Sequence, residues 1–252
     1  MAAQFDAYPP ALAHCRRCPR LVEHREAVAS RKRRAYRDQP YWGAPVPGFG
    51  DPHARIVVVG LAPGAHGSNR TGRMFTGDAS GDFLYPALHR AGLASTALSR
   101  GRDDGLRLQG TWITAVARCV PPANAPTPAE LDACRPWLAR DLDALSEARV
   151  LLALGRIAHD GVLKHYRARG LALTLARHSF GHGAVHRLDQ LPGSAAAGAL
   201  PLFDAYHVSF QNTNTGRLTA AMFDAVLHDV RELAGPACRS RPGGCRRTSS
   251  VR

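Results

Sequence analysis

A loop at residues 60–78 carries the first chemically suggestive set of side chains. Its sequence, GLAPGAHGSNRTGRMFTGD, contains five glycines, one phenylalanine (Phe75) and a single carboxylate, Asp78. Glycines allow a backbone to approach a flat or anionic ligand closely. An aromatic ring beside one carboxylate suits a stacked base with an acid near its sugar. The residues alone indicate such a site no more strongly than the alternative, in which Asp78 is an N-terminal acid of the next helix.

The same loop lacks the signatures of three common ligand-binding or catalytic loops. It contains no G-x-G-x-x-G and no G-K-[ST], and no G-x-S-x-G elbow follows a strand. Dinucleotide binding, Walker-type phosphate binding and serine hydrolysis are therefore unsupported.

Six cysteines suggest metal chemistry. Cys15 and Cys18 form a C-x2-C pair, Cys119 and Cys134 are single, and two more lie in the C-terminal tail. Because a cytoplasmic protein rarely keeps disulfides, the first four predict a metal site. The spacing does not choose between zinc and an iron–sulfur cluster. The alternative is that Cys119 and Cys134 are small buried hydrophobic residues.

Alternating apolar strands and helices must position these residues. The pattern predicts strands at 54–60, 111–119, 149–155 and 201–209, and helices at 81–93, 127–145, 156–170 and 218–235. Thr127 and Glu130 predict a capping box, with Pro128 at the first helical position. The repeated strand–loop–helix unit predicts a single-domain, three-layer α/β/α fold with a mostly parallel central sheet.

Ligands of such sheets bind at the carboxyl ends of the strands. We therefore expect the loops at 60–78, 119–128 and 207–217 to converge on one site. Residues 1–235 are expected to form the catalytic domain, with a flexible insertion at 189–200. The tail 236–252 is rich in arginine, contains no acid, and is expected to be disordered.

The charge balance favours a polyanionic partner. The chain has 33 basic and 20 acidic residues, a formal net charge of +13. Coding bias would explain a preference for arginine over lysine among these basic residues. It does not explain the excess of basic over acidic residues. No apolar run approaches a membrane span, and the N-terminus lacks the features of a signal peptide. We expect a cytoplasmic monomer with no membrane partner.

Three segments together resemble the family five (type b) branch of the uracil-DNA glycosylases. They are the 60–78 loop, RCVPPANAPTPAE at 118–130 and HVSFQNTNTGRLT at 207–219. The resemblance, which runs from Cys15 to about Gly235, implies a uracil-DNA glycosylase-like fold and a 4Fe-4S cluster on Cys15, Cys18, Cys119 and Cys134. One departure is Met74, where the family pattern has proline, and we expect it to loosen the turn that presents Phe75.

The implied reaction is hydrolysis of the N-glycosidic bond of a deaminated base flipped out of double-stranded DNA. The residues do not distinguish among uracil, hypoxanthine and xanthine as the base that is released. Asp78 would stabilise the cationic sugar or orient water. Asn124 would share that task because Ala62 offers no water-positioning group, although a simple turn asparagine is the alternative. His207 would donate to the base oxygen, although a structural histidine is the alternative.

The resemblance also implies a set of substrate-binding residues, with Phe210 or Gln211 filling the space that the flipped base vacates. Ser209 and Arg217 would hold phosphates or cap the next helix. The predicted substrate-binding residues are Gly64, Phe75, Ser209, Phe210, Gln211 and Asn212.

Two other classes of protein compete with this interpretation. A non-catalytic iron–sulfur nucleic-acid-binding protein would need the basic segments but no acid, so an Asp78→Ala substitution separates it from an enzyme. A zinc-stabilised RNA-binding module would give a colourless protein.

Overall fold

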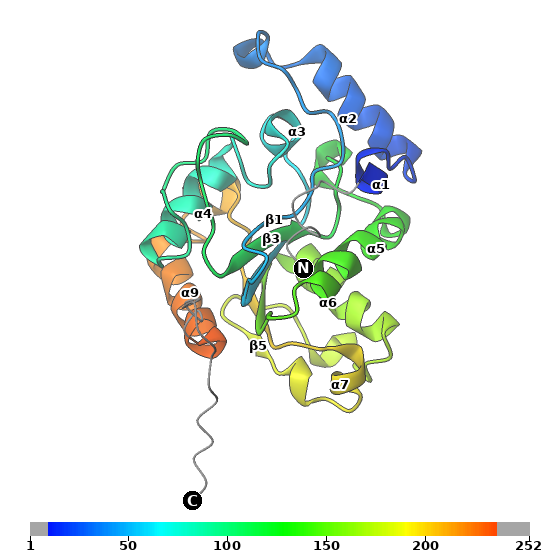
Figure 1. Ribbon diagram of the computed structural model, residues 1–252, viewed down its shortest axis with the longest axis vertical. Coiled ribbons are helices and arrows are strands. Elements are labelled where there is room, and N and C mark those ends of the chain that lie inside the picture. The colour runs from blue at the N-terminus through cyan, green and yellow to red at the C-terminus, as the bar shows by residue number, and fades with distance from the viewer. Residues whose placement is uncertain (1–9, 236–252) are drawn as a thin grey trace, which may run out of the picture.

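A computed structural model describes residues 10–235 (Figure 1). Its centre is a six-stranded sheet. The strand order is β1-β3-β2-β4-β6-β5. The four inner strands are parallel, and the short edge strands β1 and β5 run antiparallel to their neighbours. The strands are β1 (Phe49–Gly50), β2 (Ile56–Gly60), β3 (Thr111–Ala115), β4 (Val150–Leu154), β5 (Val185–His186) and β6 (Leu202–Ala205).

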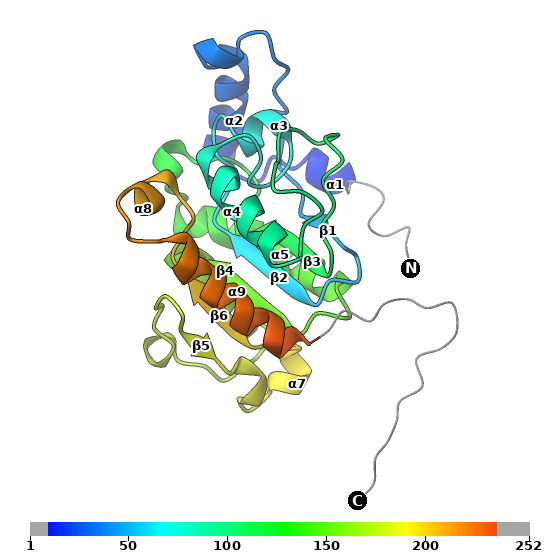
Figure 2. The same cartoon turned by 90° about the vertical axis from the view of Figure 1, so that its left-hand side faces the viewer.

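Helices cover both faces of this sheet (Figure 2). The α-helices are α1 (Pro10–Ala13), α2 (Pro19–Arg31), α3 (Ser68–Thr71), α4 (Ala79–Arg90), α5 (Pro128–Ala144), α6 (Arg156–Ala168), α7 (Ser194–Ala197), α8 (Phe210–Asn214) and α9 (Ala220–Ala234). Short 3-10 turns are η2 (Arg34–Tyr36), η3 (Pro122–Asn124), η4 (Leu175–Arg177) and η5 (Leu188–Gln190). Helices α4 and α9 pack on one face, and α5 and α6 pack on the other.

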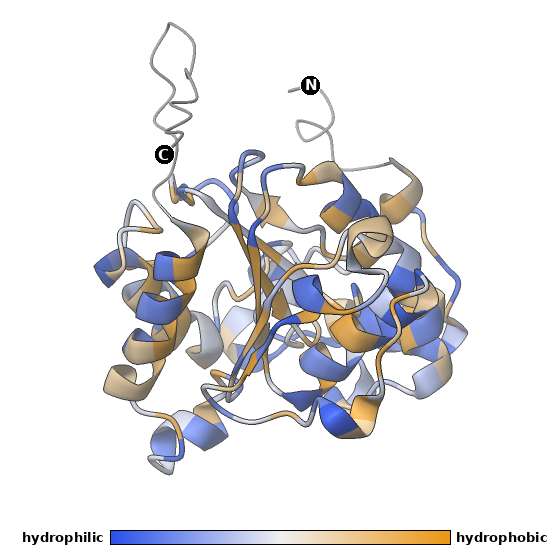
Figure 3. Cartoon of the chain, turned by 90° about the horizontal axis from the view of Figure 1, so that it is seen from below, coloured by the Kyte–Doolittle hydropathy of each residue, from blue (hydrophilic) through white to orange (hydrophobic). Residues whose placement is uncertain are grey.

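The alternation of side chains along β2 shows how the two cores arise. Ile56 and Val58 belong to the core under α4 and α9, whereas Val57 and Val59 belong to the core under α5 and α6. Successive strand residues point to opposite faces, so a strand covered on both sides is apolar throughout. Figure 3 shows the hydrophobic strands between the two helical layers.

The predicted three-layer α/β/α fold is confirmed, but several boundaries were wrong. Strands β3 and β6 are shorter than the predicted 111–119 and 201–209, because buried residues such as Val116 and Val208 extend the apolar pattern beyond the paired backbone. The edge strands were missed because each spans two residues. The Thr127 capping box is present as predicted.

The flexible insertion expected at 189–200 is wrong. The segment folds into part of η5 and α7, and Ala197 and Ala199 are buried in the core beneath α6. The composition of this segment resembles that of a loop, but its small alanine side chains can also pack closely in a core. The tail 236–252, with Cys238 and Cys245, lies outside the described residues. None of the helices within 10–235 is long and apolar enough to cross a bilayer.

Candidate active site

The three loops at the carboxyl ends of the parallel strands converge on an open cleft of about 830 Å³. Every predicted catalytic and substrate-binding residue lines it except Asn212, which instead supports the backbone nearby. Those that line the cleft are Gly64, Phe75, Asp78, Asn124, His207, Ser209, Phe210 and Gln211.

Asp78 serves as the N-cap of α4 and also faces the cleft. Its Oδ1 accepts hydrogen bonds from the backbone N–H groups of Ser80 (3.1 Å) and Gly81 (3.2 Å). Its Oδ2 lies on the side of Gly64 and Gly67. Burial raises the pKa of Asp78, and the two N–H donors oppose that rise. The helix-capping and cleft-facing interpretations are compatible, because each uses a different oxygen.

The glycines of the first loop make room for this carboxylate. A Cβ atom on Gly67 would lie 1.8 Å from Asp78 Oδ2, and one on Gly64 would lie 2.7 Å from it. Neither position therefore accepts a side chain without moving Asp78. The glycine-rich composition is a steric requirement of a loop that passes directly over its own carboxylate.

Phe75 lies on a strained turn at the floor of the cleft. Its φ of 52° is in the left-handed region. Its ring packs against Gly60, where an added Cβ atom would lie only 2.7 Å from Phe75 Cζ. The Tyr85 hydroxyl donates to the backbone oxygen of Met74 at 2.7 Å. We expected Met74 to loosen this turn, but its side chain is buried and its carbonyl is anchored.

His207 follows β6 and lies beside Phe75, with 6.2 Å between the ring centroids. Its backbone oxygen accepts a hydrogen bond from Asn212 Nδ2 at 2.8 Å. Burial lowers the pKa of His207, so the ring is neutral near pH 7. A neutral imidazole has one N–H donor and places no full positive charge in the cleft.

Asn124 reaches the cleft from the proline-rich loop. Both Ala123 (φ 52°) and Asn124 (φ 56°) adopt left-handed backbone conformations, and the Asn124 side chain is exposed. Asparagine tolerates this conformation better than most residues, so the backbone supplies one reason for its presence. Ala62 lines the same cleft and presents only a methyl group.

The 207–217 loop presents an apolar side chain to solvent. Phe210 is 64% exposed and begins the short helix α8. Ser209 caps that helix by accepting from Asn212 N–H at 3.4 Å, so the capping alternative describes its role in this structure. Arg217 lies over the Tyr206 ring at 4.7 Å.

Sequence reasoning missed several cleft residues. Arg33 and Tyr36 enter from the segment after α2, and His66 and Asp82 flank Asp78 in the chain. The Tyr41 hydroxyl is 3.0 Å from His66 Nδ1. The basic run at 31–37 was a visible signal, but only the folded chain places it at the cleft.

The four predicted cysteine ligands line a second, small cavity that shares no lining residue with the cleft. All four are free thiols, and they are Cys15, Cys18, Cys119 and Cys134. Burial raises the pKa of Cys119, and it raises that of Cys134 to about 12. Thiolates here would therefore need positive partners, and Arg25 Nη1 already donates to Cys119 Sγ at 3.0 Å.

Comparison with known proteins supplies the family. A family model described as the uracil DNA glycosylase superfamily matches residues 47–231. The chain is 55% identical to the type-5 uracil-DNA glycosylase of Thermus thermophilus, over 91% of this chain and 98% of the relative. It is 50% identical to that of Mycobacterium leprae (88% and 92%) and 42% identical to that of Pyrobaculum aerophilum (92% and 94%). These matches span nearly the whole domain that carries the cleft, so the chain belongs to the uracil DNA glycosylase superfamily.

Proposed function

We propose that this protein is a DNA repair glycosylase that hydrolyses the N-glycosidic bond of uracil in double-stranded DNA. Hypoxanthine and xanthine are proposed as further substrates. The observation that carries the proposal is one cleft lined by a carboxylate, an aromatic ring and a neutral imidazole: Asp78, Phe75 and His207. Its support from comparison is the similarity to type-5 uracil-DNA glycosylases.

Asp78 acts on the sugar. As the bond breaks, the sugar becomes an oxocarbenium-like cation, and a nearby carboxylate stabilises it electrostatically. The ionised form is held by two backbone N–H groups on Oδ1, which leaves Oδ2 for the cation or for the attacking water. Burial of Asp78 strengthens this interaction because less water screens it.

His207 acts on the leaving base, which departs with negative charge on its oxygens. A neutral, preorganised N–H donor stabilises that charge at the moment it develops. Phe75, packed beside His207, supplies an aromatic surface for the base. Asn124 assists from the opposite loop by orienting water, since Ala62 has no polar group.

DNA approaches over two features at the mouth of the cleft. Phe210 is exposed and can occupy the space left in the base stack. Arg33 and Tyr36 line the mouth and continue the basic run at 31–37, which suits the phosphate backbone. A monomeric active form stays a prediction. A cytoplasmic location stays a prediction.

We further propose that the four cysteines hold a 4Fe-4S cluster. All four cysteines line one small cavity, and the sequence resemblance described above implies a cluster there rather than a single zinc ion. Two residues that line the cavity have buried donors without hydrogen-bond partners among the described residues: Arg118 Nε and Nη1, and Trp137 Nε1. Such donors suit an anionic, sulfur-rich group. When bound, the cluster would cross-link the N-terminal segment to α5.

The cluster is tested by colour and metal content. Replacing any of the four cysteines with serine should remove the brown colour and the iron, whereas Cys238→Ser should retain both. A colourless, zinc-containing and fully active protein would refute the cluster and leave the glycosylase proposal intact.

The catalytic proposal is tested by release of free base from duplex oligonucleotides that carry uracil, hypoxanthine or xanthine. We expect release of uracil by the wild-type protein and its loss in Asp78→Ala, with duplex binding retained by both. Binding without release by the wild-type protein would instead support the non-catalytic alternative.

A further inference from the structure

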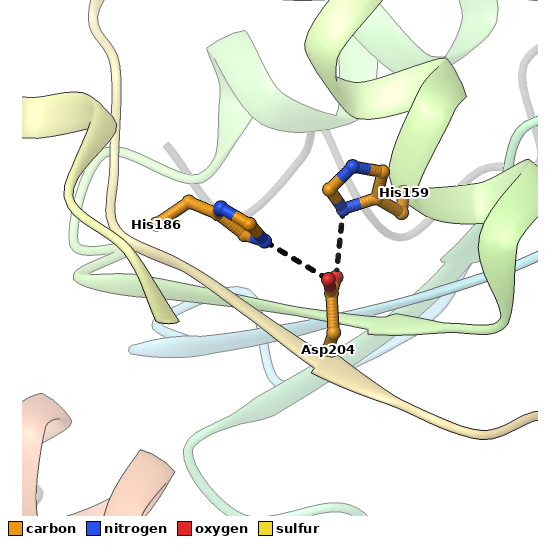
Figure 4. Close-up of side chains that lie close together, drawn as sticks. All are labelled: His159, His186 and Asp204. Atoms are coloured by element: carbon orange, nitrogen blue, oxygen red, sulfur yellow. Dashed lines mark hydrogen bonds and ion pairs between the residues drawn. The ribbon is translucent and has the colours of Figure 1, made fainter. Parts of the chain in front are cut away.

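A buried cluster of His159, Asp204 and His186 lies beside the strand that leads to His207 (Figure 4). The three residues come from α6, β6 and β5. His159 Nδ1 lies 2.8 Å from Asp204 Oδ1, and His186 Nε2 lies 3.0 Å from Asp204 Oδ2. None of the three lines the cleft, so the reaction described above does not use them directly.

Both ring nitrogens of His159 face hydrogen-bond acceptors. Besides the carboxylate, Nε2 lies 2.8 Å from the backbone oxygen of His178. A carbonyl oxygen only accepts, so Nε2 carries a proton. Gly181 N–H donates to Asp204 Oδ2 at 3.3 Å, and the hydrogen bonds with His159 and His186 lower the pKa of Asp204, so its ionised form is favoured. The second proton therefore lies on His159 Nδ1, which makes this ring an imidazolium paired with a carboxylate.

The residues around these histidines form a strap, residues 178–186, that lies along β6. Gly183 N–H donates to the backbone oxygen of Asp204 at 2.9 Å, and Asp204 N–H donates to the backbone oxygen of Ala184 at 3.0 Å. Both the backbone and the carboxylate of Asp204 therefore form hydrogen bonds with the strap.

Farther along, the strap contacts the residue immediately before His207. Tyr206 N–H donates to His182 Nδ1 at 3.1 Å, and the two rings stack with 4.9 Å between centroids. Phe180 lies against both His159 (5.8 Å) and Tyr206 (6.2 Å). The strap therefore connects the buried pair to the backbone that carries His207.

We propose that the His159–Asp204 pair holds the strap against β6 and thereby positions His207 for reaction. His159 and Asp204 are positioning residues, because neither touches the cleft. This inference rests on the proposed role of His207, whose placement relative to the base sets how well it stabilises the leaving oxygen.

Titration of His159 gives the proposal a distinct signature. The groups that face its ring are Asp204, His186, His178 and Asp160. Burial lowers the pKa of His159, but the hydrogen bond and the charge of Asp204 outweigh it and raise the pKa above 6.5. The stabilisation from this charged pair is therefore present below about pH 6.5, and it is lost as the pH rises through the raised pKa of His159.

The first test compares His159→Asn with His165→Asn. Asparagine keeps a donor toward Asp204 but cannot carry the charge. His165 is a matched control because it is equally buried on α6, and burial lowers its pKa to about 4, so it is neutral. We expect His159→Asn to slow single-turnover uracil release roughly ten- to a hundred-fold, with unchanged duplex affinity. It should also lack the wild-type decline of rate at alkaline pH, whereas His165→Asn should keep both rate and decline. Equal effects of the two substitutions would overturn the proposal.

The second test is independent of activity. Nitrogen-15 NMR of the wild-type protein below pH 6.5 should show two protonated ring nitrogens on His159, and one of them should lose its proton as the pH rises further. A singly protonated ring below pH 6.5 would overturn the proposal, as would stoichiometric zinc binding that His159→Asn abolishes, since the cluster would then be a metal site. If His207→Ala alone retained the wild-type rate, the role of His207 would fail while this NMR result still reported on the pair.

Discussion

Asp78 and Asp204 are both carboxylates at the carboxyl-terminal side of the sheet, yet their oxygens are used in opposite ways. Asp204 is completely buried, and both of its oxygens accept hydrogen bonds from histidines or backbone. Asp78 is partly exposed, and its bonds from Ser80 and Gly81 fall on one oxygen, with the other beside two glycines at an open cleft.

The consequence is an opposite shift in acidity. Burial raises the pKa of Asp78 because its two N–H donors do not compensate for lost water. Burial also acts to raise the pKa of Asp204, but the hydrogen bonds from His159 and His186 outweigh it and lower the value. An incompletely partnered carboxylate is available to a cation that forms during reaction, whereas a fully partnered one stabilises structure.

The largest expected effect is on activity at Asp78. Asp78→Asn keeps an oxygen for the α4 cap but removes the negative charge. We expect single-turnover uracil release to fall about 100- to 1000-fold, with cooperative unfolding retained. Asp82→Asn is the control because Asp82 lines the same cleft within the first turn of α4. A near wild-type rate for Asp78→Asn would remove the distinction between the two carboxylates.

The next effect is on stability at Asp204. Asp204→Ala leaves the His159 imidazolium buried without its partner, so we expect the free energy of unfolding to fall by about 3–5 kcal/mol. Urea denaturation measures this change. The control is Asp224→Ala, because Asp224 pairs with Arg90 on the surface and should contribute about 1 kcal/mol or less. Similar losses from both substitutions would contradict the structural role of Asp204.

A third prediction sets the two carboxylates apart by pH. Because the pKa of Asp78 is raised in the folded state, its protonation stabilises the folded protein below about pH 3.8. This stabilisation is lost as the pH rises through the raised pKa. Asp78→Asn should therefore gain stability relative to wild type as the pH rises from about 3.8 through the raised pKa of Asp78. The contribution of Asp204 is present above about pH 3.8 and is lost as the pH falls through its lowered value, so the Asp204→Asn penalty should stay constant in that range. Parallel curves for the two variants would show that both carboxylates are equally partnered.

The smallest effect concerns Asn124, where backbone and amide can be separated. Asn124→Gly accepts the left-handed backbone, whereas Asn124→Ala adds a strain of about 1 kcal/mol. If the amide orients water, both variants should lose activity to the same degree, by less than about a hundredfold. Full activity of the glycine variant would assign Asn124 to the turn alone.

The fold was predictable where local chemistry and tertiary packing agree. Val57 and its neighbours are apolar on both faces, which already implies a buried parallel strand, and Thr127 with Glu130 marks a helix start by their own hydrogen bonds. The burial of Ala197 was not predictable, because alanine is common both in loops and in tightly packed cores. The edge strands could not be predicted, because two residues are too few to show an alternating hydrophobic pattern.

The sequence by itself determined which side chains follow each strand, and parallel topology then required Asp78, Asn124 and His207 to meet at one edge of the sheet. Only the tertiary structure decided how each is partnered. Asp78 keeps an oxygen at the cleft because Gly64 and Gly67 pass beside it, and Asp204 loses both of its oxygens to histidines from α6 and β5. The physical reason is that reactivity depends on desolvation and on which donors fill each lone pair, and both are properties of contacts between segments distant in the chain.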